Sequence, residues 1–351
     1  MSLMKLLKYF LIFIPISIMA DILKLNRVLI FLFSALAIIP LAGVMGEATE
    51  EISVYSGPRI GGFLNATFGN ATELIISFFA LKEGLFDVVK ASIAGSVIGN
   101  ILLVLGASIL FGGLKYKTQR FNRNAIDISS SMLLFSVIGL SIPAIFTHTV
   151  NKELLNSSRY EWLSIAVASI MLIIYLLSLY FSFHTHKDLL GTEHQEAVEA
   201  KWGLKKAILV LIAATIFVAI ESEFLVGSVE YLTKSLGLSE FFVGIIIIPI
   251  IGNAAEHSTA VLMALKNKMD VAVEIALGSS LQIILFVAPV LIFLSLIFKP
   301  MSIVFNEFEL ISLIVAVVIA NKITNDGESN WLEGVQLIAV YIIIAFSFII
   351  L

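Results

Sequence analysis

The sequence predicts an all-α polytopic membrane protein with eleven transmembrane helices: one N-terminal helix followed by two inverted five-helix repeats. Three observations support this prediction. The 351 residues are 59% hydrophobic and only 14% charged, with a mean hydropathy of +1.02, which is typical of a chain that lies largely in lipid. Charge-poor apolar runs recur along the whole chain. Two of these runs carry nearly the same polar motif, 183 residues apart.

The apolar runs define the predicted helices, because about 20 mainly apolar residues are needed to cross a bilayer. They cover residues 3–20, 28–54, 60–82, 88–114, 125–148, 160–183, 205–232, 239–265, 271–298, 306–322 and 332–351. The first run, with Lys5 and Lys8 ahead of a short apolar stretch, also resembles the start of a signal peptide. Since Ile18 and Ala20 make a poor cleavage site, we predict a retained helix.

The charges predict orientation and exclude several functions. Assigning loops by parity places 14 Lys and Arg residues on the side of the N-terminus and 8 on the other. Because positive loops remain in the cytoplasm, the N-terminus is predicted to be cytoplasmic and the C-terminus outside. The net charge of −4 offers no basic face for nucleic acid, and the absence of cysteine excludes disulfides and thiolate chemistry.

An internal duplication organises the chain. At the offset of 183, nine of 36 positions between 61 and 96 are identical to their counterparts. The predicted parts are an extra helix (1–24), a first five-helix repeat (25–184), an acidic cytoplasmic linker helix (185–202) and a second repeat (203–351). Five is an odd number, so the second repeat is inverted in the membrane, as in many secondary transporters.

The duplicated motif places a carboxylate in each repeat. It reads Gly69-Asn70-Ala71-Thr72-Glu73 in the first repeat and Gly252-Asn253-Ala254-Ala255-Glu256 in the second. Ionisable groups inside a membrane are costly and usually functional. Asn and Glu three residues apart share one side of a helix. Their hard oxygen ligands suit Ca2+ better than zinc or copper, and the glycines and Pro249 weaken helix hydrogen bonding beside them.

A pair of carboxylates also suits proton exchange. Two such groups in a low-dielectric site favour bound protons when no cation is present, whereas a divalent cation favours the ionised forms. Ca2+ and protons therefore compete for the pair, and the titration belongs to the pair as a whole. This competition is the minimal physical basis for obligatory exchange.

The residues resemble the calcium/proton exchangers of the cation/calcium exchanger superfamily. The resemblance rests on residues 46–50, 65–73, 252–257 and 278–282 and covers nearly the whole chain. It implies a Ca2+/H+ antiporter without enzyme activity or cofactor, in which Glu73 and Glu256 bind Ca2+ and carry protons. Asn70, Asn253 and carbonyls at helix breaks would complete the Ca2+ shell. It also implies that helices 28–54 and 205–232 slide against a helical core to alternate access.

Further polar residues are weaker candidates for lining the pathway. They are Ser96, Asn100, Ser279, Gln282, His257, Glu47 and Glu230. The serines are equally compatible with helix packing, and His257 with either tuning proton affinity or a hydrogen-bonded packing role. The acidic residues would gather cations in a vestibule. Partners implied by the sequence are Ca2+, H+ and the lipid bilayer, with a homo-oligomer also compatible.

Three other functions compete with this interpretation. A sodium/calcium exchanger would resemble Gly-Thr-Ser-x-Pro-Glu where this chain has Gly-Asn-Ala-x-Glu, so ligands suited to Na+ are missing. An intramembrane metal-dependent hydrolase would use Glu256-His257, but no His-Glu-x-x-His motif is present. A channel could use paired acidic groups as a filter, although the repeats favour a transporter. The membrane is predicted to be a prokaryotic plasma membrane, with a vacuolar membrane as the alternative.

Overall fold

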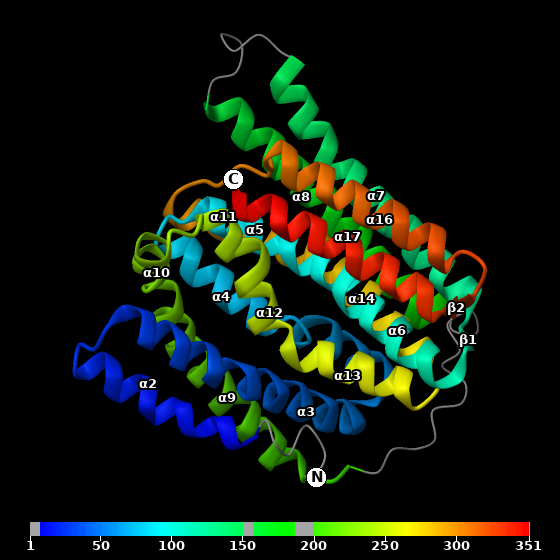
Figure 1. The fold of residues 1–351 in the computed structure, drawn as a ribbon, viewed down its shortest axis with the longest axis horizontal. Coiled ribbons are helices and arrows are strands. Elements are labelled where there is room, and N and C mark those ends of the chain that lie inside the picture. The colour runs from blue at the N-terminus through cyan, green and yellow to red at the C-terminus, as the bar shows by residue number, and fades with distance from the viewer. Residues whose placement is uncertain (1–7, 150–156, 187–199, 351) are drawn as a thin grey trace. The chain divides into compact units, whose positions relative to one another are not determined.

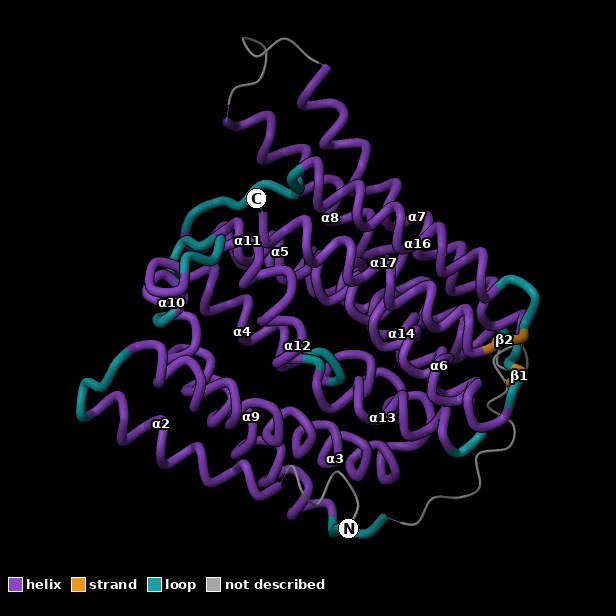
Figure 2. Tube along the Cα trace, in the orientation of Figure 1, coloured by secondary structure: helices purple, strands orange, loops and turns teal. Residues whose placement is uncertain are grey.

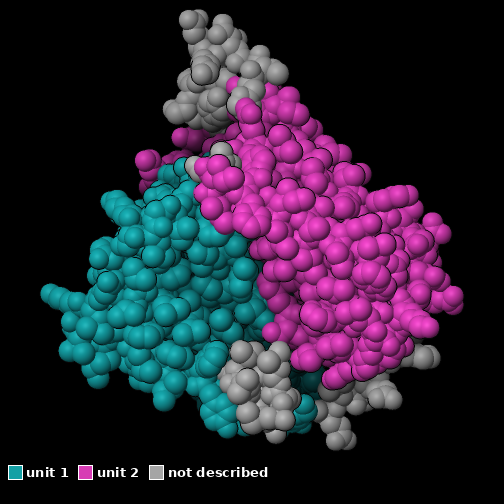
Figure 3. Space-filling model, in the orientation of Figure 1, with its two compact units in different colours: residues 1–92, 191–256, 351 teal, residues 93–190, 257–350 magenta. Residues whose placement is uncertain are grey.

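The computed structural model describes residues 8–149, 157–186 and 200–350, which are almost entirely helical (Figures 1 and 2). The described residues form two compact units, coloured separately in Figure 3. The first unit takes its residues from 1–92 and 191–256, and the second from 93–190 and 257–350. Each unit therefore combines parts of both halves of the sequence. The predicted linker helix lies mostly outside the described residues.

The elements follow one another along the chain with short connections. The first half contains η1 (Tyr9–Ile12), α2 (Phe13–Ile22), α3 (Arg27–Phe68), α4 (Ala71–Lys82), α5 (Phe86–Ile98), η2 (Gly99–Val104), α6 (Leu105–Tyr116), β1 (Thr118–Arg120), α7 (Arg123–Thr149), α8 (Ser157–Tyr180) and η4 (Phe181–Thr185). The second half contains α9 (Leu204–Val226), α10 (Val229–Leu236), α11 (Glu240–Phe242), η7 (Val243–Ile247), α12 (Ile248–Gly252), α13 (Ala254–Leu265), α14 (Met269–Gln282), η8 (Ile283–Val287), α15 (Ala288–Phe298), α16 (Glu307–Thr324), β2 (Glu328–Asn330) and α17 (Trp331–Ile350).

Seven stretches of the described chain are long and apolar enough to cross a membrane. They are Arg27–Ser56, Phe86–Tyr116, Arg123–Thr147, Glu161–Thr185, Leu204–Leu236, Met269–Phe298 and Trp331–Ile350. The pair Glu240–Gly252 and Ala254–Leu265, bent by 61°, makes an eighth if it is one span. The other predicted helices correspond to the shorter α2 and α4 and to α16, which carries three charged residues near its ends.

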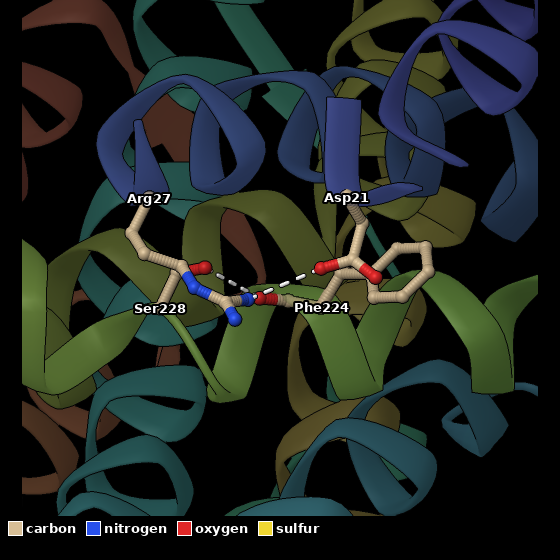
Figure 4. A network of polar contacts seen from close by, with 4 residues as sticks. All are labelled: Asp21, Arg27, Phe224 and Ser228. Atoms are coloured by element: carbon tan, nitrogen blue, oxygen red, sulfur yellow. Dashed lines mark hydrogen bonds and ion pairs between the residues drawn. The ribbon is translucent and has the colours of Figure 1, made fainter. Parts of the chain in front are cut away.

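The first unit is held together mainly by α3 and α9, which pack along each other with α2 beside them (Figure 1). A buried apolar cluster joins them, formed by Leu41, Met45, Ala71, Ala214 and Val218. The α2–α3 turn is closed by Arg27, whose Nη1 lies 3.2 Å from Asp21 Oδ1 (Figure 4). In the same view, Ser228 Oγ donates to the Phe224 carbonyl just past the end of α9 (Figure 4).

Helix α3 reverses direction within its length. Ser53 Oγ donates to the carbonyl oxygen of Gly61 over 3.1 Å, whereas eight residues of straight helix rise about 12 Å. A sharp bend must therefore lie between these two residues, where the sequence has Gly57-Pro58 and proline removes a backbone donor. The predicted break between helices 28–54 and 60–82 exists, but as a bend within an assigned helix rather than as a loop.

Three predicted helices are not continuous, which corrects the prediction. The segment 60–82 is divided at Gly69–Asn70 and the segment 239–265 at Asn253, while 205–232 is interrupted between α9 and α10. Asn70 has φ −103° and ψ 26°, and Asn253 has φ −92° and ψ 5°. Both lie near the sparsely populated bridge region. Asn tolerates such geometry better than the apolar residues around it, because its side chain bonds locally to the backbone.

Element boundaries recur at the sequence offset of 183. Helix α4 spans residues 71–82 and α13 spans 254–265, while α5 begins at residue 86 and α14 at residue 269. The π-helical segments η2 and η8 end at residues 104 and 287. The duplicated sequence thus produces duplicated local structure, including the helix breaks.

The second unit contains a small β-ribbon that the all-α prediction omitted. Strands β1 and β2 pair antiparallel, with Thr118 opposite Asn330 and Arg120 opposite Glu328. Behind the ribbon, α6 and α17 cross closely through two glycines: a Cβ added at Gly334 would lie 2.6 Å from the Gly106 carbonyl oxygen. Such a contact is possible only without side chains, as in many membrane helix pairs.

Contacts at the ribbon bring three loops of the second unit together. Gln119 Nε2 donates to the Ala264 carbonyl over 2.9 Å, and the Asn122 amide donates to Asp270 Oδ1 over 2.5 Å. The loops after predicted helices 88–114, 239–265 and 306–322 therefore lie at one end of the second unit. Parity assigns all three of these loops to the side of the N-terminus.

Candidate functional site

The first copy of the motif lies where α3 ends and α4 begins. Asn70 occupies the N-cap position of α4, and Glu73 lies in its first turn. Both side chains are buried, with 1% and 5% of their surface exposed. The N-terminal end of a helix carries partial positive charge, so the break directs a positive helix end towards a buried carboxylate.

The second copy repeats this arrangement at the bend between α12 and α13, visible in Figure 2 as a loop between two helices. Asn253 is 1% exposed. Its backbone amide and its Nδ2 both donate to the Pro249 carbonyl, each over 3.0 Å. Glu256 lies in the first turn of α13 and is half-buried. The local bonds of Asn253 stabilise the bend that places Glu256.

The two copies meet within the first unit. Helix α4 contacts α12, and the Glu73 side chain lies against Gly252: a Cβ added there would be 3.1 Å from Glu73 Oε1. The carboxylates of Glu73 and Glu256 are close enough to repel each other. Glu73 Oε2 is buried and accepts no hydrogen bond from the described part of the chain. An acceptor in this state favours a cation or a proton.

The donor set fits a hard dication. Within the described residues, no three side chains of the types His, Cys, Asp and Glu gather into a metal-binding group. Asn70 and Asn253, near the two glutamates in the sequence, carry amide oxygens. Oxygen ligands of mixed type in flexible geometry are characteristic of Ca2+ sites. The ligand roles of Glu73, Glu256, Asn70 and Asn253 stay predictions.

Three of the weaker candidates form a hydrogen-bonded chain in the second unit. Asn100, in the π-helical segment η2, donates through Nδ2 to Ser279 Oγ over 3.1 Å. His257 Nε2 lies 3.1 Å from Asn100 Oδ1, a distance that fits donation by the ring when that nitrogen carries the proton. Asn100 and Ser279 are buried. Residues from the two halves are thereby fixed relative to each other within this unit.

We expect Asn100→Leu to lower stability, because the substitution keeps the volume but removes both hydrogen bonds of this chain. The free energy of unfolding should fall by about 1–3 kcal/mol. Ser279→Ala removes one of the two hydrogen bonds and should lower it by roughly half as much. Thermal unfolding of the purified protein in detergent measures the change. Equal unfolding temperatures of Asn100→Leu and the wild type would show that these hydrogen bonds contribute nothing to stability.

The remaining candidates lie in different surroundings. Ser96 is 1% exposed in α5, and Gln282 is half-buried at the end of α14. Glu47 forms an ion pair with Lys8, whose Nζ lies 2.7 Å from Glu47 Oε2. Glu230 pairs with Lys234 one helical turn away on the surface of α10. Their roles in a pathway stay predictions, and the ion pairs of both acidic residues give each a local electrostatic partner.

One polar contact was missed by sequence reasoning. Glu221 in α9 is fully buried, and its Oε1 accepts a hydrogen bond from Ser17 Oγ over 2.6 Å. This contact ties the extra helix α2 to α9. The signal available in the sequence was an acidic residue inside an apolar run, but Ser17, 204 residues away, could not be identified as its partner.

Comparison with known proteins identifies the family. The sequence profile described as sodium/calcium exchanger protein matches residues 26–184 and 206–350. The chain is 49% identical to a Ca2+/H+ antiporter of Aphanothece halophytica, covering 96% of this chain and 94% of the relative. It is 47% identical to the Ca2+/H+ antiporter ChaA of Bacillus subtilis, covering 96% and 97%.

A solved structure of native YfkE matches the fold with a TM-score of 0.85 and 44% identity, over 97% of this chain and 100% of that one. Profile, relatives and structure all extend over both copies of the Gly-Asn-Ala-x-Glu motif. The chain therefore belongs to the sodium/calcium exchanger protein family.

Proposed function

We propose that this protein is a secondary antiporter that exchanges Ca2+ for H+ across a membrane by alternating access. The observation that carries the proposal is the buried carboxylate of Glu73, which lies against Gly252 within electrostatic reach of Glu256. The relatives at 47% and 49% identity that are named Ca2+/H+ antiporters support the same function.

The pair of glutamates makes the exchange obligatory. Two neighbouring carboxylates repel each other unless a cation or protons neutralise them. Binding of Ca2+ favours two ionised carboxylates and expels the protons, and protonation removes the charges that hold Ca2+. The site therefore holds either ion but not both. Ca2+ is the transported substrate, bound by Glu73 and Glu256 and completed by Asn70, Asn253 and backbone carbonyls.

The proposed architecture has eleven transmembrane helices: the extra helix 1–24 and two inverted repeats, 25–184 and 203–351, joined by the linker 185–202. The recurrence of element boundaries at the offset of 183 supports the repeats. The contacts of Gln119 and Asn122 with residues 264 and 270 support the loop parity. The proposed orientation has the N-terminus in the cytoplasm of a prokaryotic cell and the C-terminus outside.

Uptake of radioactive Ca2+ into proteoliposomes with an imposed pH gradient tests this function. The expected result is uptake that follows the pH gradient, collapses when an ionophore dissipates it and is unchanged by a Na+ gradient. Uptake that requires a Na+ gradient would instead assign the chain to sodium-coupled exchange. Uptake that is driven by a Ca2+ gradient alone, with no gradient of H+ or Na+, would indicate a channel.

A further inference from the structure

A pocket of about 340 Å³ lies between α7 and α16, within the second unit. Its lining includes Arg123, Asp127, Ser131, Leu134, Asn321 and Lys322. Helix α7 begins at Arg123 and α16 ends at Thr324, so the pocket lies at the ends of two neighbouring apolar helices (Figure 1). The polar ends of membrane helices lie at the level of the lipid headgroups.

Three charged side chains line this pocket. In residues 8–149, 157–186 and 200–350, neither Arg123, Asp127 nor Lys322 makes an ion pair or a side-chain hydrogen bond. All three are exposed. Asn321 reaches the Ser130 carbonyl through Nδ2 over 3.5 Å, while its Oδ1 is buried and accepts no hydrogen bond within the same described part. The pocket thus offers two cations, one anion and an amide oxygen acceptor.

An apolar surface continues from the pocket towards the middle of the membrane. On α7, the helical spacing that connects the pocket residues 127, 131 and 134 leads on to Ile138 and Ile142, and on α16 the spacing leads back from Lys322 to Val318 and Ile311. The side chains of Leu134, Ile138, Ile142, Val318, Val315 and Ile311 are between 42% and 59% exposed. Because α7 and α16 contact each other, these exposed apolar residues of the two helices form one surface next to the charged pocket.

We propose that this pocket binds the headgroup of one phosphatidylethanolamine molecule, whose acyl chains lie on the apolar surface of α7 and α16. Arg123 and Lys322 bind the phosphate, and Asp127 accepts a hydrogen bond from the ammonium group. Charge complementarity selects this lipid, since only a headgroup carrying both signs of charge uses all three residues. Phosphatidylcholine presents the same phosphate, but its trimethylammonium group has no N–H to donate. Basic pockets between membrane helices are known to hold lipid phosphates.

Native mass spectrometry of the purified full-length protein, delipidated in detergent and titrated with single lipids, tests the site. We expect the wild type to bind one phosphatidylethanolamine about tenfold more tightly than phosphatidylcholine, because of the charge-assisted hydrogen bond to Asp127. Asp127→Asn should weaken phosphatidylethanolamine binding more than phosphatidylcholine binding, because both ammonium groups lose the negative charge but only phosphatidylethanolamine also loses a charge-assisted hydrogen bond. The double variant Arg123→Gln, Lys322→Gln should bind both lipids with an affinity that is lower by about tenfold or more.

The matched control is the double variant Lys266→Gln, Lys268→Gln, which removes two exposed positive charges of the same unit outside the pocket. It should bind both lipids as the wild type does, and size-exclusion profiles check that every variant is folded. Equal binding by the Arg123 and Lys322 variant and the wild type would overturn the site. Tighter binding of phosphatidylglycerol than of phosphatidylethanolamine, unaffected by Asp127→Asn, would overturn the choice of lipid. Inorganic phosphate that competes fully with the lipid would show that the apolar surface contributes nothing.

Discussion

Glu73→Gln and Glu256→Gln should each lower Ca2+ uptake driven by a pH gradient by about 100-fold or more. Glutamine keeps the size of the side chain and an oxygen ligand but removes the negative charge and the ability to bind an exchangeable proton. A change of 100-fold corresponds to about 2.7 kcal/mol. Losing one of two carboxylates around a dication in a buried site is expected to cost at least that. Initial rates in proteoliposomes with matched protein content measure the effect.

The matched control is Glu328→Gln, which removes a half-buried glutamate of the β-ribbon, whose side chain is 45% exposed, and its ion pair with Arg120. Its uptake should equal that of the wild type, since an exposed ion pair contributes little. The double variant Glu73→Gln, Glu256→Gln should be no worse than either single variant, because both residues serve one ion. Uptake above a tenth of the wild-type rate in either single variant would contradict a site that needs both carboxylates.

The sequence predicts the location of the candidate site because the polar motif occurs twice. Glu73 and Glu256 were identified from two features alone: an acidic residue in an apolar run, and the same motif 183 residues apart. The structure places Glu73 against Gly252 within one unit. Duplication is informative in this way because each copy of a sequence folds into the same local structure, including its helix break.

The course of the chain around the site was less predictable. Hydropathy detects apolar length but not where a helix stops, so residues 60–82 were predicted as one helix although the chain breaks at Asn70. The glycines and Pro249 beside the breaks are predicted weak points, yet glycine and proline occur in continuous helices too. The π-helical segments around Asn100 and after Gln282 leave no pattern in apolar sequence, since the side chains remain apolar in either geometry.

Contacts between distant residues were not predictable from one sequence. Asn100, Ser279 and His257 were each selected as polar residues in apolar segments, but their hydrogen-bonded chain links positions 157 and 179 residues apart. The β-ribbon is a second example. Each strand has only three residues, too short to show the alternation of apolar and polar side chains that identifies a strand.

Gly252→Val should reduce Ca2+ uptake by about tenfold or more, and Gly252→Ala by a smaller factor. The Cβ of alanine would lie 3.1 Å from Glu73 Oε1, which is closer than ordinary van der Waals contact. The Glu73 carboxylate must then move away from its position beside the second motif, and the branched side chain of valine enlarges the displacement. Gly203→Ala is the matched control, because an added Cβ there meets nothing within 4 Å.

A double-substitution experiment separates displacement of the carboxylate from general damage to the helix break. In a Glu73→Asp background the carboxylate is withdrawn by one methylene, so the Cβ of Gly252→Ala meets less of the side chain. Gly252→Ala should therefore reduce Ca2+ uptake by a smaller factor in that background than in the wild type. Such non-additivity is expected of residues in contact. Measuring uptake over a range of Ca2+ concentrations for the four proteins gives this difference. An equal reduction of uptake by Gly252→Ala in both backgrounds would mean that the glycine is needed for the backbone conformation of the helix break rather than for the position of Glu73.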